Sequence, residues 1–317
     1  MKKIVLLFII LLISISCSDD IRISETKKDY SRSSWPIYRG DLNLSGKTDY
    51  ELSGNLNLKW VFKTGGDIVA SPVVGLGKIY IGSADSNMYA LNINNGDLVW
   101  KFNSGDEIEA SALLLDSNIY FGNLGGDFYS LSADDGKMNW SSKVDGDIRG
   151  SANYGFNPLL NSNVVYVGCY DSRMYAFNSS TGEKLWDYKT GNYINGAPAV
   201  IDEYLAFGGC DAKLHIVNKN DGNKIGEVIT GSYIAASVAI AENYAYLGKY
   251  DNNLIKIDLN KEKIVWKFED DENGGPFFSS PAVGNGIVIA GSRDGYLYCI
   301  DKETGEKKWS FKTLDEI

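Results

Sequence analysis

The chain of 317 residues has one histidine, four cysteines and a formal net charge of −10. This charge argues against a nucleic-acid-binding surface, which needs clustered Lys and Arg. The single histidine, His215, excludes a His-rich metal site and leaves a Ser-His-Asp triad only one possible base. No Gly-x-Ser-x-Gly nucleophile elbow accompanies that base. The composition therefore favours neither nucleic-acid binding nor the common hydrolase chemistries.

Cysteine is too scarce for a disulfide-stapled protein. Besides Cys17, which belongs to the N-terminal signal discussed next, the chain has Cys169, Cys210 and Cys299, and three residues do not make a paired framework. Cys169 and Cys210 fall at adjacent positions of neighbouring repeats, so one bridge between them stays open. We expect buried free thiols instead. No two cysteines are adjacent in the sequence.

The longest apolar run lies at the N-terminus, where Lys2 and Lys3 precede Ile4 to Ile13. Its positive start, its length and the small residues that follow indicate a secretory signal, and it is too short to span a membrane. Cys17 after a small residue resembles the bacterial lipobox, with Ser14 where that motif usually has Leu. This resemblance implies a signal peptide over residues 1–16 and lipidation of Cys17, and Ser18 is compatible with outer-membrane sorting. Residues 17–33 are polar and predict a flexible tether.

The mature chain carries no convincing helical period but repeats a pattern of short β-runs. A glycine closes the second run of each unit, with spacings of 40, 46, 40, 40 and 43 residues. The last run carries a tryptophan, and in the fourth unit Gly226 stands where one is expected between Trp186 and Trp266. The closing glycines are Gly82, Gly122, Gly168, Gly208, Gly248 and Gly291. The tryptophans are Trp60, Trp100, Trp140, Trp186, Trp266 and Trp309.

A period near 40 residues with four short β-runs is typical of propeller blades. We therefore predict an all-β protein in which residues 34–317 form one β-propeller of four-stranded antiparallel blades. Six units are complete, and the strand around Trp60 is a further copy of the outer strand. This favours seven blades, the seventh incomplete and built from about residues 35–64, with six blades as the alternative. The tryptophans are predicted to dock each blade on the next.

Two kinds of recurring residue are candidates for chemistry but are better explained by the fold. An aspartate follows the closing glycine at Asp85, Asp171, Asp211, Asp251 and Asp294, with Gly125 in its place in the second unit. A residue repeated in nearly every unit serves the unit, so we expect each aspartate to bond its own turn rather than a metal. His215 falls where other units have Tyr, which predicts a packing role.

The period is broken by two insertions, over residues 153–162 and 269–278. Because loops on a rigid scaffold are where partners bind, their apolar residues are candidate partner contacts. These residues are Tyr154, Phe156, Leu159, Leu160, Phe277 and Phe278.

The units resemble the PQQ-type, or quinoprotein-like, propeller repeat, most closely at residues 289–301 with Thr304, Gly305 and Trp309. The likeness extends over about residues 35–313 and includes the lead-in Trp35-Pro36-x-Tyr38-Arg39-Gly40-Asp41. Quinoprotein dehydrogenases share this repeat but hold their quinone with Ca²⁺ ligands and usually adjacent cysteines. That pair is absent here, so we expect no cofactor, no metal and no enzymatic activity.

The anchored propeller is also similar to the propeller lipoprotein of the outer-membrane β-barrel assembly (Bam) machinery. This resemblance implies a protein-interaction scaffold in the bacterial cell envelope, lipid-anchored and facing the periplasm, with envelope proteins as partners. That family normally has eight blades and a longer chain, so no contact residues are transferred. Two alternatives remain: a PQQ-dependent dehydrogenase-like or other redox enzyme, and a propeller that binds a small ligand or glycan in its central channel.

Overall fold

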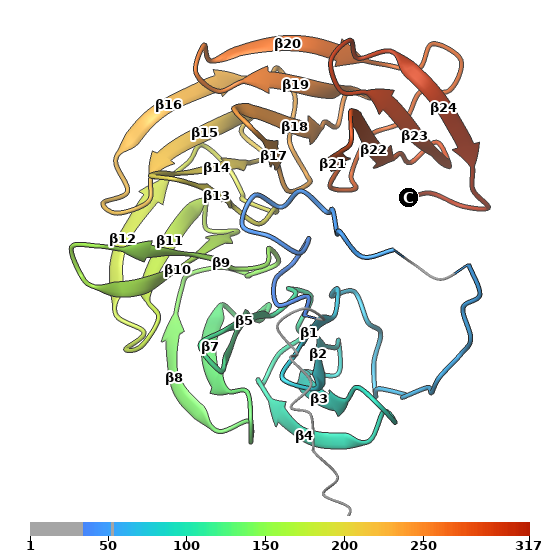
Figure 1. Ribbon diagram of the computed structural model, residues 1–317. Coiled ribbons are helices and arrows are strands. Elements are labelled where there is room, and N and C mark those ends of the chain that lie inside the picture. The colour runs from blue at the N-terminus through green and yellow to red at the C-terminus, as the bar shows by residue number, and fades with distance from the viewer. Residues whose placement is uncertain (1–33, 52–53) are drawn as a thin grey trace, which may run out of the picture.

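The computed structural model describes residues 34–51 and 54–317, so the predicted signal peptide, Cys17 and the tether lie outside the described residues. Within the described residues all regular structure is β, in six four-stranded sheets arranged around a common axis (Figure 1). Each sheet is a meander of four consecutive antiparallel strands, which confirms the all-β propeller architecture. No helix in the described part of the chain has the length and apolar character needed to cross a bilayer.

Each blade runs from an inner strand near the axis to an outer strand at the rim. Blades 1 to 3 consist of β1 (Val73–Gly75), β2 (Lys78–Gly82), β3 (Asn87–Asn92), β4 (Leu98–Asn103), β5 (Leu113–Leu115), β6 (Asn118–Gly122), β7 (Asp127–Ser132), β8 (Met138–Lys143), β9 (Asn153–Asn157), β10 (Ser162–Cys169), β11 (Arg173–Asn178) and β12 (Lys184–Lys189).

Blades 4 to 6 repeat this order toward the C-terminus. They consist of β13 (Ala199–Ile201), β14 (Tyr204–Gly208), β15 (Lys213–Asn218), β16 (Lys224–Ile229), β17 (Ala239–Ala241), β18 (Tyr244–Gly248), β19 (Leu254–Asp258), β20 (Lys263–Phe268), β21 (Ala282–Gly284), β22 (Ile287–Gly291), β23 (Tyr296–Asp301) and β24 (Lys307–Lys312).

The core lies between neighbouring blades, because each blade buries both of its faces against the next. Between blades 1 and 2, for example, Tyr80 and Met88 pack against Phe121 and Leu131. Each closing glycine makes room for an apolar residue in the loop that leads to the next blade. A Cβ on Gly122 would lie 2.2 Å from the side chain of Ile148. This explains why a glycine stands at or next to the end of the second strand in each blade.

The tryptophans lie at the blade junctions. The indole of Trp140 packs on Gly182, in the third hairpin of the next blade, and donates from Nε1 to the Ser179 carbonyl at 2.9 Å. A Cβ on Gly182 would lie 2.6 Å from the indole, and its φ of +73° also favours glycine. The same packing joins Trp60, Trp100, Trp186 and Trp266 to Gly96, Gly136, Gly222 and Gly305. Of these four indoles, all but that of Trp186 also donate to a backbone carbonyl in the described residues. Trp309 has no such partner in the described residues and is 46% exposed.

The seven-blade count is not confirmed. The described residues form six sheets, which is the number of blades in the alternative prediction. The described part of residues 35–64 forms no sheet. Their one strand-like contact is a bridge between Trp35 and Val74. The sequence showed that Trp60 repeats the outer-strand pattern, and it does lie against Gly96 of blade 1. However, the segment that carries Trp60 is not assigned as a strand and pairs with no strand in the described residues.

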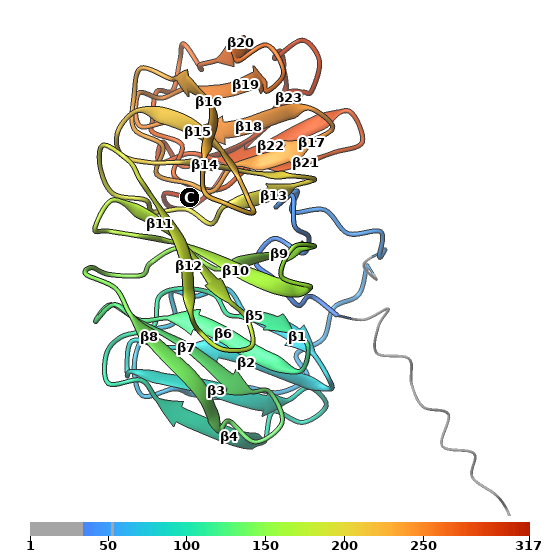
Figure 2. The same cartoon turned by 90° about the vertical axis from the view of Figure 1, so that its left-hand side faces the viewer.

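Residues 35–46 instead cross the axis of the propeller on one face (Figures 1 and 2). Their backbone carbonyls accept hydrogen bonds from the backbone N–H groups of inner strands. The pairs are Val74 to Trp35, Leu114 to Pro36, Val200 to Leu42, Ile240 to Asn43 and Val283 to Ser45, at 2.7–2.8 Å. In blade 3, the Asn153 side chain donates to the Leu42 carbonyl at 2.8 Å. The segment therefore contacts all six blades, and we call it the axial segment.

Candidate functional site

The recurring aspartates lie in the turn between the second and third strands. Asp85 accepts from the backbone N–H of Asn87 at 3.1 Å, which is the predicted bond to its own turn. It also accepts from Gly65 N at 2.7 Å and from the hydroxyl of Tyr89 at 2.5 Å. Asp171 and Asp294 bond the tyrosines four residues later in the same way. These carboxylates tie a turn to a strand and to the preceding loop, rather than face a site.

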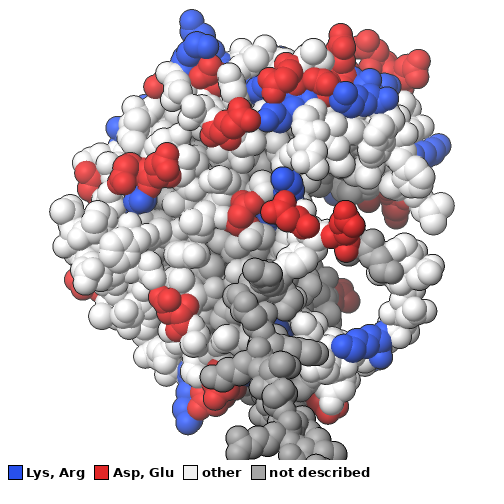
Figure 3. Space-filling model, viewed as in Figure 1, with Lys and Arg blue, Asp and Glu red and all other residues white. Residues whose placement is uncertain are grey.

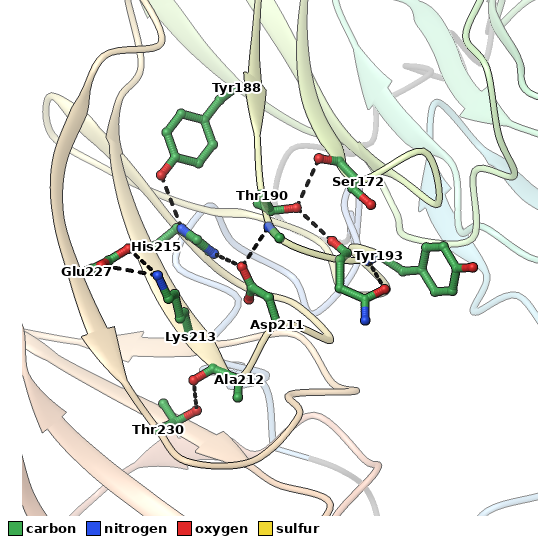
Figure 4. A network of polar contacts seen from close by, with 12 residues as sticks. Ser172, Tyr188, Thr190, Tyr193, Asp211, Ala212, Lys213, His215, Glu227 and Thr230 are labelled. Atoms are coloured by element: carbon green, nitrogen blue, oxygen red, sulfur yellow. Dashed lines mark hydrogen bonds and ion pairs between the residues drawn. The ribbon is translucent and has the colours of Figure 1, made fainter.

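His215 takes the place of that tyrosine in blade 4 (Figure 4). Its Nε2 lies 2.9 Å from Oδ2 of Asp211, and the hydroxyl of Tyr188 lies 3.2 Å from its Nδ1. The imidazole is buried and stacked on Phe207, with ring centroids 5.4 Å apart. The Tyr-His-Asp chain looks like catalytic machinery, but the bond to Asp211 corresponds to the Tyr–Asp bonds of other blades, and the edge-on contact of the two rings corresponds to that of Phe102 with Tyr129. His215 is placed as a packing residue, as expected.

The electrostatics of Asp211 fit this structural role. Burial alone would raise the pKa of its carboxyl, but hydrogen bonds from His215 and from the Gly191 N–H, at 3.0 Å, outweigh burial and hold the pKa below its usual range. A carboxylate that is better stabilised in the folded protein than in the unfolded chain contributes to stability.

This shift predicts a pH-dependent contribution from Asp211. Because the folded-state pKa is lowered, the contribution is present above about pH 4, the ordinary Asp pKa, and is lost as the pH falls toward the lower folded value. We expect Asp211→Asn to cost stability at pH 7 and progressively less below about pH 4. Denaturant unfolding at several pH values measures this, with Asp202→Asn at an exposed residue as the control. A cost that does not change with pH would contradict the assignment.

In two blades, other side chains tie the turn between the second and third strands to its surroundings. In blade 2, where Gly125 replaces the aspartate, Asn123 accepts from Asp127 N at 2.8 Å and donates to the Ser104 carbonyl at 2.9 Å. In blade 5, Lys249 is buried and donates to Asp251 and to the Thr230 carbonyl, both at 2.9 Å. The deviations from the repeat are therefore compensated locally.

No group of three or more His, Cys, Asp or Glu side chains is arranged to hold a metal in the part of the chain that the structure describes. Cys169, Cys210 and Cys299 are free thiols, so the bridge between the first two, left open by the sequence, is not formed. Burial raises the pKa of the Cys169 thiol to about 12, which keeps it protonated and unreactive near neutral pH.

A polar cavity of about 310 Å³ lies on the axis beneath the axial segment. Serines that precede the inner strands line it and link neighbouring blades. Ser71 N donates to Ser111 Oγ at 2.9 Å, and Ser111 N donates to Ser151 Oγ at 3.1 Å. Arg39 and Arg149 also contribute to the wall.

The charged residues of this cavity were not identified from the sequence. Arg149 bonds Glu109 at 2.6 Å and Asp147 at 2.9 Å, and these ion pairs raise its pKa although burial opposes the shift. Burial lowers the pKa of Arg39, whose Nε and Nη2 are buried without a hydrogen-bond partner in the described residues. A signal for this wall did exist, because the residue two positions before each serine changes from repeat to repeat, as in Val69, Glu109 and Arg149.

The first insertion lengthens the hairpin between β9 and β10, which reaches toward the face occupied by the axial segment (Figure 2). At its tip Leu159 is 88% exposed, and Phe156 and Leu160 are about half exposed. Tyr154 is partly buried against the apolar cluster between blades 2 and 3. Three of the four candidate contacts on this loop are therefore accessible.

In the second insertion, the prediction of an exposed partner contact is wrong for Phe277, which is 2% exposed. It takes the place that isoleucines such as Ile234 occupy elsewhere, and its Cβ would meet a Cβ on Gly248 at 2.5 Å. Phe278 is partly exposed beside the axial cavity, 4.6 Å below the guanidinium of Arg293. The insertion thus supplies a core residue and one residue of the cavity wall.

A search of curated protein sequences found no match. Among solved structures, BamB from Moraxella catarrhalis is similar, with a TM-score of 0.68 at 16% identity, covering 81% of this chain and 78% of that one. A europium-containing methanol dehydrogenase is similar with a TM-score of 0.66 at 14% identity, covering 78% of this chain and 69% of that one. At such identities these likenesses show a shared fold alone.

A family model described as outer membrane protein assembly factor BamB matches residues 99–311. The match spans β4 to β24, which is more than half of the chain. It includes every repeat tryptophan except Trp60 and every turn aspartate except Asp85. The resemblance expected from the repeat sequence is thereby confirmed. The chain belongs to the family of the outer membrane protein assembly factor BamB.

Proposed function

We propose that this protein is a non-enzymatic, lipid-anchored scaffold in the bacterial cell envelope that binds protein partners during outer-membrane protein assembly. The family assignment supports this reading. The observation that carries it is the β9–β10 hairpin, where an insertion into the repeat places exposed Phe156, Leu159 and Leu160 at one tip. Exposed apolar side chains grouped on a rigid scaffold are typical of protein-binding surfaces.

A scaffold role also agrees with how the reactive side chains are used. His215, the one imidazole, is buried between Asp211 and Tyr188 and has no access to a substrate. The aspartates of the repeat bond turns, and the buried Lys249 bonds a carboxylate of its own blade. On the face seen in Figure 3, basic and acidic residues are interspersed, with no single-sign patch that would attract a highly charged partner.

Secretion and anchoring are part of the proposal. The signal at residues 1–16 and the lipidation of Cys17 would place the propeller at the outer membrane, facing the periplasm. Residues 17–33 would tether it, and the axial segment begins directly after them. The β9–β10 hairpin reaches toward the face of the axial segment (Figure 2), so both lie on one side of the propeller.

In-cell crosslinking tests the hairpin as the partner surface. A photoreactive amino acid at Leu159 is expected to give adducts with envelope proteins of outer-membrane assembly, because this side chain is 88% exposed at the tip. Leu160→Asp in the same protein should reduce those adducts at least several-fold, since desolvating even an uncharged polar group without a hydrogen bond costs about 1–3 kcal/mol and a carboxylate costs more. The control position is Ile229, which is 71% exposed on β16. No adduct at Leu159, or the same adducts at Ile229, would contradict the proposal.

A further inference from the structure

The propeller has one junction that is unlike the other five. Between blade 6 and blade 1 the described chain has no sheet: residues 54–69 run there as extended chain, and the C-terminal residues 313–317 lie along the turns of blade 6 (Figure 1). Figure 3 shows the surface hollowed there, inside the arc of chain that leads into this segment. We call this region the open sector.

One wall of the open sector is the forward face of blade 6, which lacks the cover that this face has elsewhere. Trp309 is 46% exposed, whereas Trp100 and Trp266 at the same repeat position are each 8% exposed. Phe311 is 63% exposed, whereas the corresponding Phe268 is 6% exposed. The side chains that cover these positions in other blades come from the next blade along the chain.

The other wall is the rear face of blade 1 together with residues 58–69. Ile68 is 50% exposed, whereas Ile108, Ile148 and Ile234 at the same repeat position are fully buried. Beside it lies an apolar cavity of about 280 Å³ between Trp60, Phe62 and Ile81. In a closed junction this space is filled by the preceding blade.

The strand that would form the rim of a blade in this sector is already present. Trp60 packs on Gly96 and donates from Nε1 to the Ile93 carbonyl at 3.1 Å, as Trp100 does to the Ala133 carbonyl at 3.2 Å. Residues 58–63 therefore occupy the position of a fourth strand. Their backbone pairs with no other strand in the described residues, so a row of N–H and C=O groups is left unpaired on one edge.

We propose that the open sector binds a partner polypeptide as a three-stranded antiparallel β-meander, which pairs with residues 58–63 and completes a blade. Two facing apolar walls require an occupant that is apolar on both faces, as the inner three strands of every blade are. The unpaired edge requires an extended strand, since backbone groups are satisfied by strand addition. The occupant thus uses the same contacts as the five closed junctions.

The test compares the accessibility of a cysteine in the sector in two settings. Phe311→Cys in the full chain is treated with a maleimide reagent, once after purification in detergent and once in isolated envelopes. The purified protein should react rapidly. In envelopes the reaction should be roughly tenfold slower if a partner occupies the sector about nine-tenths of the time, because only protein with an unoccupied sector reacts. Ile229→Cys, at a residue 71% exposed on β16, should react equally in both.

A second substitution tests whether the occupant pairs with residues 58–63. Val61 is 76% exposed, so Val61→Pro should leave the purified fold intact by circular dichroism while removing one edge N–H. It is expected to restore rapid labelling of Phe311→Cys in envelopes, and Val61→Ala is not.

Three results would overturn the proposal. Equal labelling of Phe311→Cys in both settings would mean that nothing occupies the sector. Protection that persists after Val61→Pro would mean that the occupant does not add strands to residues 58–63. Protection in the purified protein would mean that the sector is filled by the chain itself or, if it depends on concentration, by a second copy.

Discussion

Trp140→Ala is expected to lower the free energy of unfolding by about 3–5 kcal/mol, the largest effect of any single repeat position. Trp140 is 9% exposed, packs against Tyr120 and Phe128, and bonds the Ser179 carbonyl of the next blade. The substitution opens a cavity at a blade junction and removes one of the two donors of that carbonyl, the other being the Tyr120 hydroxyl at 3.1 Å. Denaturant unfolding followed by circular dichroism measures the loss.

The chain offers a matched control for this prediction, because Trp309 has the same place in its blade but is 46% exposed. Trp309→Ala in the purified protein should change the free energy of unfolding by less than about 0.5–1 kcal/mol, as exposed substitutions usually do. Equal losses for the two variants would show that the indole contributes within its own blade, not through docking on the next one.

Cys17→Ala is expected to move nearly all of the protein from the membrane to the soluble fraction. Each acyl CH₂ group buried in a bilayer contributes about 0.8 kcal/mol, so an anchor of more than one chain holds a soluble domain stably. Without it, the acidic propeller has no other predicted means of membrane attachment. Fractionation of cells expressing the variant measures the shift, and mass spectrometry of the mature N-terminus shows whether Cys17 is acylated.

Cys210→Ala is the matched control, since it removes a thiol within the propeller that forms no disulfide. It should leave the protein at the membrane. Continued membrane association of Cys17→Ala after a high-salt wash would contradict the predicted lipoprotein anchor and point to attachment through the propeller.

The sequence predicted the blades well because each blade is specified by local, repeated residues. Gly182 needs a positive φ and room for Trp140, and both requirements recur about every 40 residues. The same repetition correctly identified Asp85 and His215 as parts of the fold. What the sequence did not show for His215 is the partner Tyr188, since that side chain comes from β12 of the neighbouring blade and the contact depends on how the two blades pack.

The errors fall where a residue's role depends on the surrounding blades. Phe277 lies in an insertion and seemed exposed, but an aromatic ring fills the same space on Gly248 that isoleucine fills elsewhere. The repeat position of Trp60 predicted that residues 35–64 form an incomplete seventh blade. Residues 35–46 instead cross the axis, where their backbone carbonyls accept hydrogen bonds from the inner strands. Backbone bonding of this kind leaves no pattern in side-chain type, so the axial segment could not be predicted.

The axial segment also determines when the protein can finish folding. Its contacts span most of the chain: Tyr38 bonds Ser280 at a separation of 242 residues, and Ser45 accepts from Val283. Contacts so distant in sequence form late, because a long loop must close before they are made. Each blade is a local meander that forms early, whereas the first described residues of the chain must wait for the last blade. During synthesis, the N-terminal segment therefore emerges first and reaches its final place last, which leaves the inner strands exposed to chaperones and proteases until the last blade is made.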